Sequence, residues 1–327
     1  MNPNFKHNLE IINELNLYKK FEVYKTFKDK QQYIALIKGN NLDIFSILNN
    51  KRILSLKGNN SIINTIRYFI NNNNFNEYLI SSDYDRIIII WDITNNYNVK
   101  HKIDMKLTRD YIINSCLLVF THNKDSYIVS TAVNCEEEFD ESSTKIYSFN
   151  DGKYIRDIIN SNNIIVYYLL SWYNKNNGDY YIVQNCNSKI LINNLFEEKK
   201  YTEFNHQPES YFYKGFIYNK NNKDYLCCCS TNGYINIWDL YNKIPVKIFY
   251  FNNYYFTDVI QWNDKYIIVI DSSNNNCGII IIDKEKEKMI SNIKSKDDFW
   301  CIKKIYHPNY GESLITSGKS KIKIWYM

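Results

Sequence analysis

The chain is poor in glycine and proline, and it lacks any long apolar run. It has 9 Gly and 4 Pro in 327 residues, whereas glycine alone makes up about 7% of ordinary proteins. Asparagine crowds the segments between apolar runs, as at 71–74 and 274–276. Because Asn tolerates left-handed backbone, we expect it to form the turns that glycine usually forms. No apolar run approaches the roughly 20 residues of a membrane helix, so we expect no membrane span.

Targeting and redox signals are also missing. The first ten residues, MNPNFKHNLE, lack the apolar core of a secretory signal. The eight cysteines show no Cys-x-x-Cys spacing, and most lie in apolar runs. We therefore expect a cytoplasmic protein, with the nucleus as an alternative, whose cysteines are reduced core residues rather than disulfides or metal ligands.

Nothing in the chain resembles a catalytic or cofactor site. The five histidines are isolated from one another, and the sequence has no nucleophile elbow, His-Glu-x-x-His, phosphate loop or dinucleotide fingerprint. The net charge is +5, with both signs scattered along the chain, so direct nucleic-acid binding is not expected either. We predict no enzyme activity, no cofactor and no metal site.

What the chain does have is a recurring strand. Apolar residues make up 45% of it, including 30 Tyr and 17 Phe, which is enough for a large core. Three alternating aliphatic runs close on tryptophan: IIIIWDI at 87–93, YINIWDL at 234–240 and KIKIWYM at 321–327. A strand repeated with the same aromatic at its end indicates a supersecondary unit copied along the chain.

The spacing of the copies predicts the architecture. Equivalent strand ends step by 46, 56, 46, 45, 44 and 43 residues, beginning at Phe45 and ending at Trp325. A blade of four short strands needs about 40 to 45 residues. We therefore predict a single all-β domain over 1–327, a seven-bladed β-propeller of four-stranded antiparallel blades. The predicted blades are 18–56, 61–104, 111–159, 164–204, 211–251, 255–293 and 299–327 with 8–15.

Strands can be assigned inside the clearest units. In the second unit the predicted strands are 63–68, 77–82, 87–93 and 99–103, and in the fifth they are 213–218, 225–230, 234–240 and 246–251. Asn232-Gly233 predicts a two-residue hairpin turn. The chain stops after the third strand of the seventh unit, so we expect the N-terminal segment LEIINEL, 9–15, to complete the last blade and close the ring.

These residues resemble those of the WD-repeat β-propellers over nearly the whole chain. Trp-Asp stands at Trp91-Asp92 and Trp238-Asp239, Trp325 closes the last unit, and Asp85 matches the family's buried turn aspartate. Other units depart from the pattern. Gly58-Asn59 replaces the family's Gly-His, so we expect the Asp, His, Ser/Thr, Trp hydrogen-bond network to be incomplete there.

Two further units lack the Trp-Asp pair. The fourth has Asn193-Asn194 and the sixth has Ile282-Asp283 in its place. We expect these blades to depend on apolar packing.

One acidic segment stands out from the repeat. CEEEFDESS, 135–143, lies between the second and third strands of the third unit and accounts for its 56-residue step. In this family that loop opens on the face that commonly binds peptides, so the segment would attract a basic partner. The alternative is a solvated insertion without a role. The carboxylates concerned are Glu136, Glu137, Glu138, Asp140 and Glu141.

Aromatic side chains form a second candidate contact surface. The resemblance places contact residues at the start of the inner strands and beside the turn aspartate, where large rings can anchor a partner. Core packing is the alternative explanation for each ring. The candidates are Tyr84, Tyr167, Phe212, Tyr255 and Trp300.

Taken together, the sequence predicts a non-catalytic protein-interaction scaffold. We expect it to bind a peptide or protein on the propeller face near the central channel, as a single propeller within a complex. The alternative function is a structural subunit of a larger assembly, of the kind found in ribosome biogenesis, RNA processing or trafficking, and an enzyme is the more remote alternative.

Overall fold

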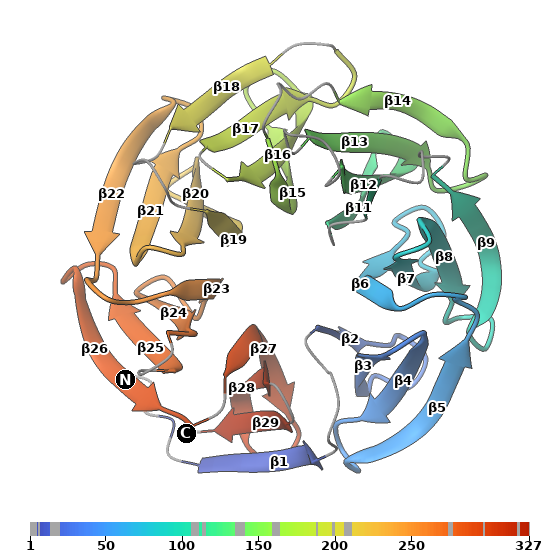
Figure 1. The fold of residues 1–327 in the computed structure, drawn as a ribbon, viewed down its shortest axis with the longest axis horizontal. Coiled ribbons are helices and arrows are strands. Elements are labelled where there is room, and N and C mark those ends of the chain that lie inside the picture. The colour runs from blue at the N-terminus through green and yellow to red at the C-terminus, as the bar shows by residue number, and fades with distance from the viewer. Residues whose placement is uncertain are drawn as a thin grey trace. The chain divides into compact units, whose positions relative to one another are not determined.

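The computed structural model is built of antiparallel sheets, whose strands are labelled in Figure 1. The described residues contain no helix, and the sheets are the blades of a seven-bladed β-propeller, which confirms the predicted fold class. The residues described are 5, 7–13, 20–105, 111–112, 116–134, 141–158, 164–187, 189–197, 200–205, 211–273, 277–296, 298–318 and 321–326.

By its internal contacts the chain divides into two compact units. The N-terminal unit comprises Lys20–Cys186 and Leu191–Tyr201, and the C-terminal unit comprises Met1–Lys19, Asn187–Ile190 and Thr202–Met327. The expectation of a single domain stays a prediction.

The N-terminal unit contains blades 1 to 3 and most of blade 4. Blade 1 consists of β2 (Phe21–Lys25), β3 (Gln32–Lys38), β4 (Asn41–Ser46) and β5 (Lys51–Lys57). Blade 2 consists of β6 (Ile63–Ile70), β7 (Glu77–Asp83), β8 (Ile87–Asp92) and β9 (Asn98–Asp104). Blade 3 consists of β11 (Leu117–His122), β12 (Asp125–Asn134), β13 (Glu141–Ser148) and β14 (Tyr154–Ile158). Blade 4 consists of β15 (Val166–Asn174), β16 (Asp179–Cys186), β17 (Lys189–Asn194) and β18 (Lys200–Asn205).

The C-terminal unit contains blades 5 to 7. Blade 5 consists of β19 (Phe212–Lys220), β20 (Lys223–Ser230), β21 (Tyr234–Asp239) and β22 (Ile244–Tyr250). Blade 6 consists of β23 (Phe256–Gln261), β24 (Tyr266–Asp271), β25 (Gly278–Asp283) and β26 (Lys288–Lys294). Blade 7 consists of β27 (Phe299–His307), β28 (Gly311–Gly318), β29 (Lys321–Tyr326) and β1 (His7–Asn13).

The N-terminal strand completes the last blade, as predicted. β1 pairs antiparallel with β29, with His7 opposite Tyr326 and Asn13 opposite Lys321. Just before β1, Phe5 is buried and packs edge-on against Trp262 of blade 6, with 5.1 Å between the ring centroids. The start of the chain is therefore anchored both by strand pairing and by an aromatic contact.

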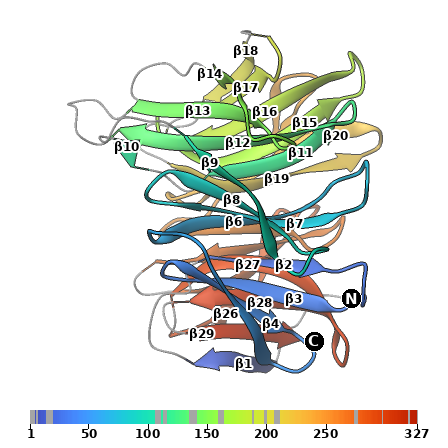
Figure 2. The same ribbon diagram turned by 90° about the vertical axis from the view of Figure 1, so that its right-hand side faces the viewer.

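Blade 3 is enlarged in the way that the 56-residue step predicts. Its middle strands are long, with 10 residues in β12 and 8 in β13. A short extra strand, β10 (Tyr111–Ile112), pairs with the far end of β12 (Figure 2). The longer hairpin accounts for part of the insertion.

One predicted turn is longer in the structure. β20 ends at Ser230 and β21 begins at Tyr234, so three residues rather than two form the turn that contains Asn232-Gly233. Gly233 has a φ of +80°, and a Cβ on it would lie 2.1 Å from the carbonyl oxygen of Phe251. Only glycine fits there, because the neighbouring strand passes too close for any side chain.

The cores lie between neighbouring blades, where one blade's apolar face packs on the next. Aliphatic residues of the middle strands fill these layers, as Ile267, Val269 and Ile280 do between blades 5 and 6. The middle strands are buried on both faces, which explains why their sequences are nearly continuous apolar runs. The outer strands have exposed faces and mixed sequences.

Candidate functional site

A register shift near the start of each inner strand decides which side chain faces outward in the C-terminal unit. In β19 the pairing moves from Phe212–Ser230 to Lys214–Cys229, and in β27 it moves from Phe299–Gly318 to Cys301–Ser317. Such a β-bulge leaves one residue unpaired and changes the direction of its side chain. The skipped residues are Tyr213 and Trp300, whereas Phe212 and Phe299 are buried in the core.

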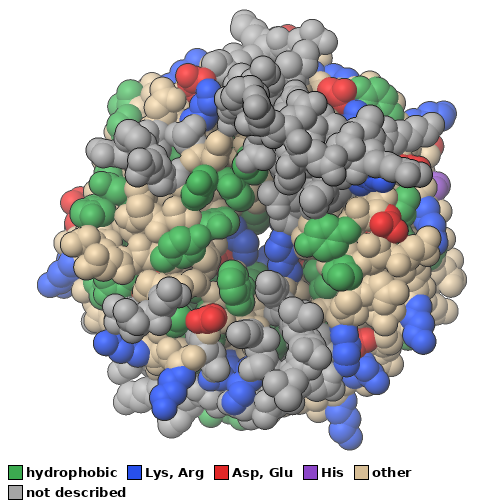
Figure 3. Space-filling view, viewed as in Figure 1, with side chains coloured by type: hydrophobic (Ala, Val, Ile, Leu, Met, Phe, Trp, Pro, Cys, Tyr) green, Lys and Arg blue, Asp and Glu red, His purple; other side chains and the backbone are tan. Residues whose placement is uncertain are grey.

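The outward aromatic residues of blades 5 to 7 form what we call the rim aromatic surface, which consists of Tyr211, Tyr213, Tyr255 and Trp300. The hydroxyl groups of Tyr213 and Tyr255 lie 3.2 Å apart, and their ring centroids are separated by 6.1 Å. Tyr255 is 37% exposed and Trp300 is 38% exposed. On the face seen in Figure 3, apolar side chains lie over β19 and β23, and Lys and Arg side chains lie both at the margin and in the middle of the view.

Hydrogen bonds hold the backbone beneath this surface. Asp271 Oδ1 accepts from the backbone N–H of Tyr255 at 3.0 Å, and the Tyr255 carbonyl accepts from Ser272 N–H at 2.8 Å. Burial raises the pKa of Asp271 above its usual value, although hydrogen bonds from Tyr255 and Ser273 act in the opposite direction. The Ser272 hydroxyl donates to the Phe299 carbonyl at 2.5 Å, which connects blade 6 to blade 7 beside Trp300. The rim residues therefore sit on fixed backbone.

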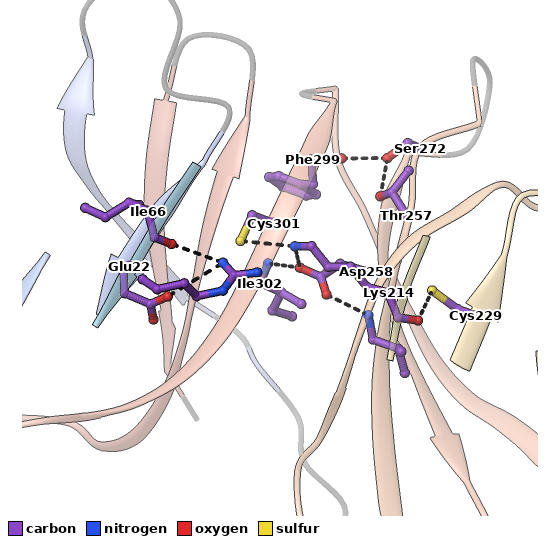
Figure 4. A network of polar contacts seen from close by, with 12 residues as sticks. Glu22, Ile66, Lys214, Cys229, Thr257, Asp258, Ser272, Phe299, Cys301 and Ile302 are labelled. Carbon is purple, nitrogen blue, oxygen red and sulfur yellow. Dashed lines mark hydrogen bonds and ion pairs between the residues drawn. The ribbon is translucent and has the colours of Figure 1, made fainter. Parts of the chain in front are cut away.

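A polar network lies deeper on the same inner strands (Figure 4). Lys214 Nζ is 2.6 Å from Asp258 Oδ2 and 3.5 Å from Cys301 Sγ. Asp258 also accepts from the backbone N–H of Ile302 at 2.9 Å. These contacts join β19, β23 and β27. Because Asp258 is buried and its oxygens are already used, the network stabilises the packing of three blades and leaves no free carboxylate for chemistry.

The N-terminal unit has its own charged cluster on its inner strands. Arg67 lies 4.0 Å from Glu22, and its guanidinium carbon is 5.3 Å from the ring centroid of Tyr168. The pair joins β2 and β6, so its role is also to connect blades.

The structure places the predicted aromatic contact residues in different environments. Tyr255 and Trp300 are exposed in the rim aromatic surface, whereas Tyr84 is exposed in the turn after β7 of the N-terminal unit, and Tyr167 is half-buried at the start of β15. Phe212 is fully buried, with its ring 5.6 Å from that of Trp238, so its proposed contact role is corrected here. The outward tyrosine of that strand is Tyr213. In the sequence, Tyr213 could have been recognised because it directly follows Phe212, an apolar residue suited to the core.

The acidic candidates fall largely outside the described residues. Glu136, Glu137, Glu138 and Asp140 lie in 135–140. Glu141 is the first residue of β13, where its backbone pairs with Asn134, and its side chain is also outside the described part. Their proposed role in binding stays a prediction.

The turn aspartate of blade 2 is Asp83, not Asp85. Asp83 is fully buried and accepts hydrogen bonds from Asn59 Nδ2 at 2.8 Å and from the Ile87 N–H at 3.0 Å. Asp85 is exposed, two residues further into the turn. A side chain in the turn itself points to solvent, whereas the last strand residue points back across the hairpin.

The polar network of blade 2 is complete, contrary to the prediction. Trp91 Nε1 donates to Ser81 Oγ at 3.0 Å, Ser81 Oγ donates to Asn59 Oδ1 at 3.3 Å, and Asn59 continues to Asp83. An amide has one acceptor and a donor, so Asn59 replaces the imidazole of the family's histidine. A Cβ on Gly58 would lie 2.5 Å from the Trp91 ring, which explains the glycine before it.

The other tryptophans and aspartates of the repeat also make contacts within the protein core and in turns. Trp325 Nε1 donates to Thr316 Oγ1 at 2.9 Å, and Trp238 stacks on Phe204 with centroids 5.3 Å apart. Asp92 accepts from the Asn95 N–H at 3.0 Å, and Asp239 does the same for the turn after β21. The aspartate after each tryptophan therefore caps the turn that follows the third strand.

The two units without Trp-Asp keep polar contacts as well. Asn193 Nδ2 donates to Gln184 Oε1 at 2.7 Å, and Gln184 Nε2 donates to Thr144 Oγ1 of blade 3 at 3.0 Å. Asn194 and Asp283 each accept two backbone N–H groups of the following turn. The expectation that apolar packing replaces the polar network is therefore wrong for blade 4, where amides take the place of the missing groups. In blade 6 the residue at the tryptophan position, Ile282, packs in the apolar core, and Asp283 caps the turn.

The thiols and the metal-ligand types offer no reactive cluster within the described chain. Seven cysteines are described, and all are buried. Burial raises the pKa of Cys227 to about 12 and that of Cys116 to about 11, so both remain protonated at neutral pH. Among the described residues, no group of His, Cys, Asp and Glu is arranged to hold a metal ion, and no helix is long and apolar enough to cross a membrane.

Comparisons with known proteins agree with the fold. Residues 50–92 match the family model described as "WD domain, G-beta repeat". No curated protein matches the chain. Among solved structures, the C-terminal WD40 domain of Sif2 matches with a TM-score of 0.63 and 11% sequence identity, over 94% of this chain and 80% of that one. The matched residues run from β5 of blade 1 to the end of β8 in blade 2, and they include the hydrogen-bond network from Asn59 to Trp91. The family model therefore identifies one WD repeat at residues 50–92, and the solved structure shows that the chain shares the fold of a WD40 β-propeller domain.

Proposed function

We propose that the chain is a non-catalytic interaction scaffold that binds a peptide or protein through the rim aromatic surface. The observation that supports this most is the exposure of Tyr255 and Trp300 on backbone that is fixed from below. Rigid aromatic rings lose little conformational entropy when a partner covers them, and they dominate the binding energy of many interfaces.

The arrangement fits binding better than catalysis. The titratable groups beneath the rim, Asp258 and Lys214, are already paired with each other at 2.6 Å. The rim itself offers hydroxyl groups and ring faces, which suit hydrogen bonds and apolar contacts to a partner. The acidic segment 135–143 would add electrostatic attraction for a basic partner and raise its association rate at low salt.

A pair of variants tests the rim. We expect the double variant Tyr255→Ala, Trp300→Ala to lose most of the partners recovered by affinity purification and mass spectrometry from the native cell. The matched control is Tyr306→Ala, because Tyr306 is an exposed aromatic at the opposite end of the strand that carries Trp300. Equal recovery of partners by the double variant and the control would contradict the proposal.

The acidic segment needs its own variant. Replacing Glu136, Glu137, Glu138, Asp140 and Glu141 with Gly and Ser should slow association with the partner, and the difference should shrink as salt is raised. Identical association rates at low salt would assign the segment no role in binding.

A further inference from the structure

The outer strand of blade 5 has an unusual exposed face. β22 is the last strand of its sheet in the order β19-β20-β21-β22 (Figure 1). Four of its seven residues are large, apolar and about half exposed: Ile244 at 52%, Val246 at 47%, Ile248 at 60% and Tyr250 at 55%. Ile244 pairs with Asp239, which lies on the opposite face of the sheet from the partners of Ile248 and Tyr250. We call Val246, Ile248 and Tyr250 the β22 edge.

The β22 edge carries no exposed charge. Lys247 is the only charged residue in β22, and its Nζ is turned toward blade 6, where it bonds to the Lys284 carbonyl at 2.8 Å and to Glu287 Oε1 at 2.7 Å. Outer strand β5 differs, because it exposes Lys51 and Arg52. Natural edge strands are usually protected from pairing by such charges. β22 is without that protection over its exposed face.

The backbone of β22 is also available on the outer side. The Phe251 N–H bonds to the Gly233 carbonyl at 3.0 Å, and Tyr250 lies opposite Tyr234. In an antiparallel pair, alternate residues direct their N–H and C=O groups to opposite sides. Ile248 and Tyr250 therefore direct theirs away from β21. Among the described residues, no backbone group beyond the β21 pairing bonds to them.

The first residues of β22 cannot pair with an added strand. Pro245 has no N–H to donate, and the pairing shifts between Trp238–Pro245 and Ile237–Lys247, which leaves Val246 in a bulge. A strand added to β22 would therefore cover only Val246–Tyr250, so the partner segment must be short.

The size of the surface decides between a second propeller and a short segment. Three large side chains at half exposure offer on the order of 300 Å², against about 800 Å² per partner in a standard interface. A second copy that touched only this row would be held weakly. A short strand adds backbone hydrogen bonds to the same apolar contact, and it needs no further surface.

We propose that the β22 edge is a strand-addition site for a short, extended, uncharged segment of a partner protein, with apolar side chains at alternate positions. The apolar positions of the segment contact Ile248 and Tyr250, and its backbone pairs with theirs. The site is on the outer edge of blade 5 and does not use the rim aromatic surface.

The test uses the full chain and two synthetic probes. The first is a fluorescent peptide of alternating valine and threonine, and the second is the same peptide with N-methyl groups on every second amide. We expect the first to bind saturably by fluorescence anisotropy and to protect the amides of Ile248 and Tyr250 from hydrogen exchange. The N-methylated peptide should not bind, because it lacks the donors that strand addition needs.

Variants locate the binding. Ile248→Lys should weaken the peptide's affinity by about tenfold or more. Ile53→Lys, at a similarly exposed position in outer strand β5, should leave it unchanged. Melting temperatures check that both variants are folded. The comparison of the two peptides on the unmodified chain tests strand addition independently of the variants.

Three outcomes would overturn the proposal. These are no binding of the unmethylated peptide, equal binding of both peptides, and protection that lies elsewhere than in β22. A chain that dimerises in sedimentation analysis, and becomes monomeric with Ile248→Lys, would overturn it in favour of a second copy as the occupant.

Discussion

Asn59 donates a hydrogen bond from Nδ2 to Asp83 Oδ2 at 2.8 Å, and both side chains are buried. This contact joins the loop that precedes blade 2 to the hairpin between β7 and β8. It also completes a path of hydrogen bonds from Trp91 to the Ile87 backbone, in a blade that lacks the family's histidine. The residue at position 59 must both donate and accept a hydrogen bond, and the planar side-chain amide of Asn59 can do both.

Asp83→Ala should destabilise the protein. The variant leaves Asn59 Nδ2 and the Ile87 N–H without their acceptor inside the blade. Because unsatisfied buried donors cost about 1–3 kcal/mol each, we expect the free energy of unfolding to fall by about 2–4 kcal/mol, measured by chemical denaturation.

Asp85→Ala is the matched control for that variant. Asp85 is exposed in the same turn, so its loss should change stability by no more than about 0.5 kcal/mol. A larger loss for Asp85→Ala than for Asp83→Ala would contradict the assignment of the turn aspartate.

Deleting residues 1–16 should lower the melting temperature sharply. The deletion removes β1, exposes the free edge of β29 and takes Phe5 away from Trp262. An unpaired outer edge also invites association between chains, so the truncated protein should aggregate sooner on heating. Differential scanning calorimetry measures both effects.

Phe5→Ala separates the two contributions of the N-terminal segment. It keeps β1 and removes only the aromatic anchor, so we expect a loss of about 3–5 kcal/mol at most. For the deletion of residues 1–16, an unchanged melting temperature would contradict the role of β1 in stabilising blade 7.

Lys284→Met should stabilise the protein at neutral pH. Lys284 is 6% exposed, and its Nζ has no hydrogen-bond partner among the described residues, although it lies 4.5 Å from the ring centroid of Tyr218. Methionine has a similar length and no charge to bury, so we expect a gain of about 1 kcal/mol or more in the free energy of unfolding.

The gain should depend on pH in a defined direction. Burial lowers the pKa of Lys284 below the usual 10.5. As pH rises through that lowered pKa toward 10.5, the folded chain releases the proton before the unfolded chain does, so the unmodified protein gains stability. The difference between it and Lys284→Met should therefore narrow as pH rises, in denaturation curves measured at several pH values. Lys288→Met, at an exposed position, should show no such trend, and a constant difference for Lys284→Met would contradict the explanation.

The strand pattern and its period were readable from the sequence, but the exact residues at strand ends were not. Alternation predicted 77–82 and the structure has Glu77–Asp83, so Asp83 is the last strand residue and is buried, whereas the resemblance to the family pointed to Asp85 in the turn. The same effect separates Phe212 from Tyr213, because the bulge in β19 reverses which side chain turns outward. Bulges arise from the pairing of two strands, and one strand's sequence does not encode them.

The sequence by itself determined that the chain is built of repeated four-stranded units, that there are seven of them, and that its first strand pairs with its last, because period and apolar alternation depend only on which residues follow one another. Only the tertiary structure decided that Asn59 completes a network, that Lys247 is drawn away from the β22 edge, and that Tyr213 and Tyr255 meet. Each of these depends on groups that are distant in sequence and adjacent in space, so their geometry is set by how strands and loops pack in three dimensions.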